Sequence, residues 1–131
     1  MRAILSAVLL LVATSTWADL VKVSEATDTV YYLDSASISD KDKFRRVSVI
    51  QDYAKQETSG ARSRRVLYEI DCTEERLRSI AGTEHSDSMA QGNSVNSWER
   101  ASEWLYVAPR TGSSIASRTP YRPILKSVCS R

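Results

Sequence analysis

The chain has 131 residues, of which 42% are hydrophobic and 26% charged, and its formal net charge at pH 7 is +2. These proportions are typical of one globular domain and exclude a disordered chain, while four glycines and three prolines exclude a fibrous or low-complexity one. One histidine, His85, and two cysteines are too few for a multi-histidine metal site or a four-ligand zinc site without an unusual set of carboxylates. We therefore expect no metal, no cofactor and no enzymatic activity.

Residues 1–18 have the pattern of a secretory signal peptide. A positive charge at the second residue precedes an apolar run of eleven over residues 3–13, and the small residues Thr16 and Ala18 lie just before the expected cleavage point. A retained membrane helix is the alternative, but the run is well short of the about 20 residues that span a bilayer. We expect an exported domain over residues 19–131, periplasmic or secreted, with the cell surface also open to it and no membrane span after cleavage.

The charge of the mature domain argues against a nucleic-acid partner. Loss of the signal leaves 17 basic and 16 acidic residues, so the domain is nearly neutral. Its cations are dense only in residues 41–46 and 62–65. A nucleic-acid site needs a basic face that neutralises several phosphates. We expect solvated strand or hairpin surfaces in both segments and no nucleic-acid binding.

Six segments carry strand signals and predict a mainly β fold. They are residues 20–23, 29–34, 44–53, 62–72, 76–82 and 104–108. A polar turn at residues 25–28 closes a first hairpin, and residues 40–43 form a charged turn. Leu77 and Ile80 fit their strand only poorly. Residues 83–97 are polar and without periodicity, so they are expected to form a loop.

The clearest alternation of apolar and polar side chains lies in residues 62–72. Strand geometry sends alternate side chains to opposite faces of a sheet. One face carries Arg64, Val66, Tyr68, Ile70 and Cys72, and the other carries Arg65, Leu67, Glu69 and Asp71. Cys72 therefore lies on the core face. Glu69 and Asp71 could act as a paired acid and base, but ion pairs with arginines of a neighbouring strand are the favoured interpretation.

Export also guides the interpretation of the two cysteines. Outside the cytoplasm, Cys72 and Cys129 have only one intramolecular pairing, which predicts a structural disulfide. A redox-active role is the alternative, but the sequence has no Cys-x-x-Cys motif.

The C-terminal part of the chain differs from the strands. Residues 110–117 are rich in glycine and serine and are expected to be weakly structured. Pro120 and Pro123 mark the start of a helix, in which residues 124–129 place apolar side chains at helical spacing. The predicted disulfide would tie this helix to the strand that ends near Cys72.

Short motifs in a distinctive order run along nearly the whole mature chain. They are Tyr31-Tyr32-Leu33-Asp34, Ser37-Ile38, Gln51-Asp52-Tyr53, Ser63, Tyr68-Glu69-Ile70-Asp71-Cys72, Ser88-Met89-Ala90-Gln91-Gly92, Trp104, Val107, Pro109 and Val128-Cys129. In order and spacing they resemble the bacterial surface-adhesin protein E family. No single motif is a catalytic signature, so the specificity of the resemblance lies in the ordered set.

The resemblance implies an α+β, mainly β fold: a single antiparallel sheet of about six strands, with a C-terminal helix packed on one face and tied by a disulfide. It also implies a non-catalytic binding protein whose partners are host matrix proteins such as vitronectin or laminin, or envelope proteins. The chain lacks the lipidated cysteine of the best-known member, which leaves surface display open. The alternative is a periplasmic envelope-maintenance or structural protein without host ligands, and either could form a homodimer.

Basic and aromatic residues supply the candidate protein-binding surface, because arginine and tryptophan dominate interface hot spots. The candidates are Arg62, Arg64, Arg65, Trp98 and Arg100. Packing and binding roles both stay open for Trp98, whereas Trp104 and Tyr106 are expected in the core.

The remaining polar motifs favour no chemistry. His85 lies among polar residues and is expected to be an exposed loop histidine. A catalytic triad with a neighbouring serine is not favoured, because the sequence has no Gly-x-Ser-x-Gly elbow. Asp40 and Asp42 resemble the start of a calcium loop, but the required glycine and distal glutamate are missing. A charged hairpin tip is expected there.

Overall fold

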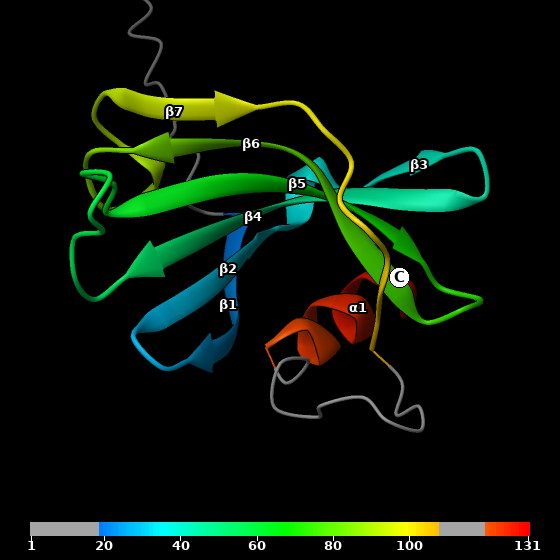
Figure 1. Cartoon of the computed structure of the whole chain (residues 1–131). Coiled ribbons are helices and arrows are strands. Elements are labelled where there is room, and N and C mark those ends of the chain that lie inside the picture. Colours follow the sequence, from blue (N-terminus) through cyan, green and yellow to red (C-terminus); the bar gives the residue numbers. More distant parts are fainter. Residues whose placement is uncertain (1–18, 108–119) are drawn as a thin grey trace, which may run out of the picture.

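A computed structural model describes residues 19–107 and 120–131 of the chain (Figure 1). The predicted signal peptide at residues 1–18 and the predicted weakly structured segment at residues 110–117 lie outside the described residues. Within the two described ranges, no helix is long and apolar enough to cross a membrane.

The described residues form one antiparallel sheet with a single α-helix on one side. The strands are β1 (Leu20–Ala26), β2 (Thr29–Asp34), β3 (Ser39–Lys41), β4 (Phe44–Tyr53), β5 (Ser63–Asp71), β6 (Arg76–His85), β7 (Ser94–Trp98) and β8 (Leu105–Tyr106). Two 3-10 turns, η2 (Ser35–Ser37) and η3 (Ser88–Ala90), and the helix α1 (Tyr121–Cys129) complete the fold. The main path of the sheet is β1-β2-β4-β5-β6-β7, while β3 pairs with β4 and β8 pairs with β6.

The predicted fold class is confirmed, but the sheet has eight strands in place of about six. The two additional strands are β3, which overlaps the predicted charged turn at residues 40–43, and β7, which overlaps the predicted loop at residues 83–97. Both consist mostly of exposed polar residues, so neither shows an apolar pattern. The poor fit of Ile80 also has a structural cause. Leu67 pairs with Ala81 and Tyr68 pairs with Ser79, which leaves Ile80 as an extra residue in a bulge.

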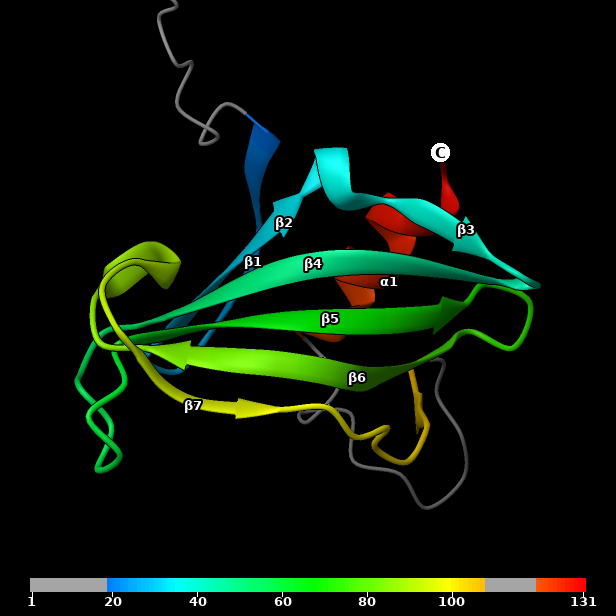
Figure 2. The same cartoon turned by 90° about the horizontal axis from the view of Figure 1, so that it is seen from above.

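The core lies between α1 and one face of the sheet. In Figure 2 the helix lies behind β4 and β5, so the opposite face of the sheet is turned toward the viewer. The fully buried core side chains include Leu33, Val47, Val49, Val66, Ile70 and Leu77 of the sheet and Ile124 and Val128 of the helix. The face that alternation predicted for residues 62–72 is thus the covered one.

Three contacts outside the apolar core fix the position of α1. The hydroxyl of Ser24 in β1 donates to the carbonyl of Pro120 at the start of the helix, at 2.7 Å. At the other end, Arg45 donates to the carbonyls of Val128 and Arg131. Cys129 forms the predicted disulfide with Cys72, just after β5, with a Cα–Cα distance of 5.7 Å. The sheet therefore holds the helix at both ends.

The opposite face of the sheet is stabilised by ion pairs. Arg46, Glu69 and Arg78 lie side by side on β4, β5 and β6. The carboxylate of Glu69, which is only 3% exposed, lies 3.1 Å from Arg46 and 2.7 Å from Arg78. Next to them, Asp71 pairs with Arg76 at 2.9 Å. The predicted pairing of both acids with neighbouring arginines is confirmed.

Trp104 covers these arginines and does not belong to the core. The guanidinium carbons of Arg76 and Arg78 each lie 4.2 Å from the centre of its indole, and the ring of Phe44 lies 5.2 Å away. Tyr106 accepts a hydrogen bond from Arg76 at 3.4 Å. The expectation that Trp104 and Tyr106 pack in the core is wrong, because cation–π contacts hold them to the arginine row.

Trp98 attaches the edge strand β7 to the core. It is directly opposite Gly82 of β6, and a Cβ atom added to Gly82 would overlap its indole ring. The remaining residues of β7 are exposed. Because Gly82 has no side chain, there is space opposite it for the indole of Trp98, the one half-buried side chain of β7.

We expect the disulfide to be a major source of stability. Replacing both Cys72 and Cys129 with serine removes a bridge that closes a 57-residue separation, and should lower the free energy of unfolding by about 2–5 kcal/mol. Urea denaturation measures this value. The wild-type chain in reductant should match the double variant, and an unchanged midpoint in both would contradict the expectation.

Gly82→Ala should be destabilising because its new methyl group competes with Trp98. The expected loss is about 1–3 kcal/mol, as for overpacking in a core. In a Trp98→Ala background the same substitution should cost well under about 1 kcal/mol, since the ring is absent. Equal costs in the two backgrounds, measured by urea denaturation, would show that the ring and the glycine are not coupled.

Asp71 should make the free energy of unfolding depend on pH in the acidic range. Burial by itself would raise the pKa of Asp71, but hydrogen bonds from the Glu74 amide and Arg76 outweigh it and lower the pKa below 3.8. Its contribution is therefore fully present above the unfolded-state pKa and is lost as the pH falls through the lower folded-state value. Between pH 6 and pH 2, the free energy of unfolding should fall less in Asp71→Asn than in the wild type. Parallel pH profiles would refute this assignment.

Candidate binding surface

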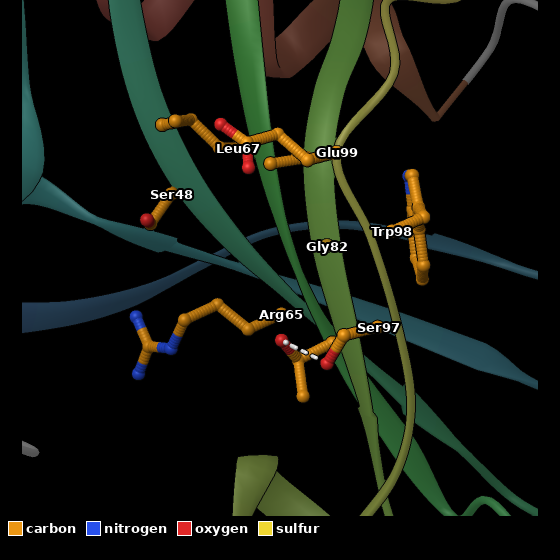
Figure 3. A pocket seen from close by; sticks show the side chains of 9 residues that line it. Ser48, Arg65, Leu67, Gly82, Ser97, Trp98 and Glu99 are labelled. Carbon is orange, nitrogen blue, oxygen red and sulfur yellow. Dashed lines mark hydrogen bonds between the residues drawn. The ribbon is translucent and has the colours of Figure 1, made fainter.

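The face of the sheet opposite α1 contains an open hollow of about 420 Å³ between β4 and β7 (Figure 3). It is lined by Ser48, Arg65, Leu67, Ala81, Gly82, Thr83, Ser97, Trp98 and Glu99. Most of these side chains are small, and the hydroxyl of Ser97 donates to that of Thr83 at 3.3 Å. The hollow arises because short side chains on β6 and β7 lie beside longer ones on β5.

Arg65 is the cation of this hollow. Figure 3 shows its side chain extending over the sheet on the side of Ser48, away from Trp98. Its side chain is 41% exposed, and its carboxylate partner Asp34 lies 3.5 Å away. An exposed ion pair of this length contributes little to stability. The guanidinium can therefore exchange Asp34 for an acidic group of a partner at small cost.

Arg64 lies on the other face of the same strand. Its Nε donates to Oε1 of Gln51 at 2.7 Å, and its guanidinium carbon lies 5.8 Å from the centre of the Trp98 ring. Trp98 packs against the core while also lining the hollow that contains Arg65. The alternation along β5 thus separates two adjacent arginines that sequence proximity groups together.

The five predicted binding residues therefore do not form one continuous cluster. Arg62 and Arg100 are exposed, just outside β5 and β7 respectively. Trp98 lies beside Arg64 and also lines the hollow that contains Arg65. Their role in binding stays a prediction.

The small residues of the hollow were not among the candidates. Ser48, Ala81, Thr83 and Ser97 carry no chemical signature, so composition could not single them out. The period-two pattern of β4 and β5 predicts that Ser48 and Leu67 share a face with Arg65. The contributions of β6 and β7 depend on their register, which includes a bulge in β6.

His85 differs from the expected exposed loop residue. It is the last residue of β6 and is half-buried, and its Nδ1 atom is buried without a hydrogen-bond partner among the described residues. Within the described ranges, no group of three or more His, Cys, Asp or Glu side chains is placed to hold a metal ion.

The turn η3 follows β6 at one end of the sheet. Its residues Met89 and Ala90 both have φ of 57°, an uncommon conformation for residues other than glycine. The amide of Met89 donates to Asp52 at 2.9 Å, and that of Ala90 donates to the hydroxyl of Ser63 at 2.8 Å. Side chains of β4 and β5 therefore fix the path of this turn.

Solved structures share the fold of this chain. Protein E of Haemophilus influenzae matches with a TM-score of 0.65 at 15% identity, over 86% of this chain and 85% of that chain. A second crystal form of that protein gives a TM-score of 0.64 at 16% identity, over 86% and 88% of the two chains. At this level of identity the likeness shows a shared fold. No match was found among curated proteins.

The sequence itself matches a known family. The family described as surface-adhesin protein E matches residues 17–130, which is nearly the whole chain, and its expected fold is the one observed. The chain belongs to the surface-adhesin protein E family.

Proposed function

We propose that this protein is an exported, non-catalytic adhesin-like protein that binds another protein through the open face of its sheet. The observation that carries the proposal is the hollow on that face, where exposed Arg65 lies over a floor that includes Leu67 and Ala81. Apolar area beside a loosely paired arginine is typical of protein-binding surfaces. Membership of a surface-adhesin family supports the same conclusion.

A non-catalytic role fits the state of the acids on this face. Glu69 and Asp71 are both buried, and both accept hydrogen bonds from arginines. A general acid has to carry a proton, and a general base has to reach its substrate. Acids buried in such ion pairs are poorly suited to either task.

The proposed partners are host matrix proteins such as vitronectin or laminin, which the protein would meet outside the cytoplasm. An acidic segment of the partner would bind Arg65. Exposed Arg100, which follows Glu99 of the hollow, would extend the contact beyond it. An envelope protein is the competing partner, and a second copy of the chain is a third. All three would use the same face, so the experiment has to separate them.

Arg65→Ala should weaken capture of the protein by immobilised vitronectin or laminin at least about tenfold, as expected for an interface hot spot. Lys126→Ala is the matched control, because Lys126 is an exposed cation on α1, on the other side of the sheet. Surface plasmon resonance measures both affinities. Equal losses in the two variants would show that the effect comes from net charge alone. Unchanged binding by Arg65→Ala would refute the assignment of this surface.

If neither matrix protein binds, affinity capture from the native envelope decides between the other partners. A protein enriched by the wild type and by Lys126→Ala, but lost with Arg65→Ala, would support the envelope role. Self-association that depends on Arg65, measured by analytical ultracentrifugation, would instead support a homodimer.

A further inference from the structure

A second hollow, of about 500 Å³, lies on the other face of the sheet, beside the end of the core. Tyr31, Gln51, Arg64 and Glu84 line it from β2, β4, β5 and β6, where they are directly opposite one another in register. Its volume is within the range of small-molecule sites. The floor of the hollow therefore includes a row of four side chains on adjacent strands, and the β4–β5 loop forms one border.

Arg64 is distinguished from the other arginines of the strands by its partners. The five others in the described strands each have a carboxylate within ion-pair distance; they are Arg45, Arg46, Arg65, Arg76 and Arg78. Among the described residues, none of the ion pairs includes Arg64. Its charge thus faces the hollow with no carboxylate of the described residues within ion-pair distance.

Neutral groups hold Arg64 in place. Gln51 is only 1% exposed, and its amide nitrogen donates to the hydroxyl of buried Tyr68 at 2.6 Å, which directs Oε1 toward Arg64. Nε of Arg64 donates to that oxygen, and the guanidinium lies over Trp98. With Nε committed, the two terminal nitrogens are the donors left for a planar anionic group.

Glu84 is the complementary charge. It is directly opposite Arg64 on the neighbouring strand, a position where opposite charges commonly pair. Its carboxylate instead accepts a hydrogen bond from the hydroxyl of Ser59 at 3.0 Å. Glu57 adds a second carboxylate from the β4–β5 loop. A cation and two acids thus face one hollow without neutralising each other.

We propose that this hollow binds a small zwitterion, either a free α-amino acid or a short peptide, whose carboxylate pairs with Arg64 and whose ammonium group pairs with Glu84 and Glu57. One ligand of this class satisfies both charges at once, whereas a simple anion leaves the two acids unpaired. This site is separate from the protein-binding face, which lies on the other side of the sheet.

Two tyrosines, Tyr31 and Tyr53, also line the hollow. Burial raises the pKa of Tyr31 to about 12, with the neighbouring Tyr121 adding to the effect. Burial also raises the pKa of Tyr53, against the opposing influence of Arg64. The hydroxyl of Tyr53 can donate to a bound carboxylate, whereas that of Tyr31 already bonds to Tyr121. The rings of both tyrosines provide apolar surface.

Titration of the full chain followed by NMR tests the proposal. L-alanine and L-alanyl-L-alanine are the zwitterionic probes, and the stronger of the two identifies the ligand as an amino acid or a peptide. N-acetyl-L-alanine lacks the ammonium group and L-alaninamide lacks the carboxylate. We expect saturable shifts of the Trp98 indole and of the Arg64 and Glu84 amides with at least one zwitterion, and at least about tenfold weaker binding of both capped compounds.

Variants assign the two charges. Glu84→Gln should remove the preference for the zwitterion over N-acetyl-L-alanine, because it removes the partner of the ammonium group. Arg64→Lys keeps the charge but loses the planar pair of donors, and should weaken the zwitterion at least about fivefold. Glu103→Gln and Lys126→Ala, at exposed positions outside the hollow, should bind as the wild type does.

The outcomes are decisive in both directions. No saturable shift up to about 10 mM of either zwitterion would overturn the proposal. Equal binding of N-acetyl-L-alanine by the wild type would also overturn it, in favour of a simple anion site. Thermal melting of each variant separates loss of binding from loss of fold, and Glu84→Gln keeps the test valid if Arg64→Lys unfolds.

Discussion

A single nine-residue helix has to cover a sheet whose main path contains six strands. At 1.5 Å per residue the helix is about 13 Å long, whereas six strands at 4.8 Å span about 24 Å. The helix can therefore bury only part of one face. Every other part of the sheet must satisfy its side chains in another way, and the polar and functional features of the protein follow from that limit.

The uncovered face uses charge in place of a second apolar layer. Glu69 is buried between Arg46 and Arg78, and Trp104 covers Arg78 and its neighbour Arg76. Such a layer tolerates water at its margin, which a core of aliphatic side chains would not. Beside it the side chains become short, and the open hollow with Arg65 begins. The ion-pair layer and the proposed binding surface thus share one face without sharing residues.

Local pattern predicted the parts of the fold that depend on one strand or one helix. Alternation in residues 62–72 identified the core face, the position of Cys72 and the separation of Arg64 from Arg65. Features that depend on which strands are neighbours in the sheet could not be predicted from the sequence. The strand β7 has no apolar pattern, Trp104 is held by arginines far from it in sequence, and the position of Arg64 opposite Glu84 requires the register of β5 and β6.

The attachment of β7 through one indole ring has a further consequence. Since four of its five residues are exposed, the cost of detaching this strand rests mainly on Trp98 and on its backbone hydrogen bonds. Local opening would uncover Gly82 and leave β6 as a new edge while the rest of the sheet stays folded. An uncovered edge can pair with an extended segment of another chain, so the molecule carries a latent position for an exchanged strand.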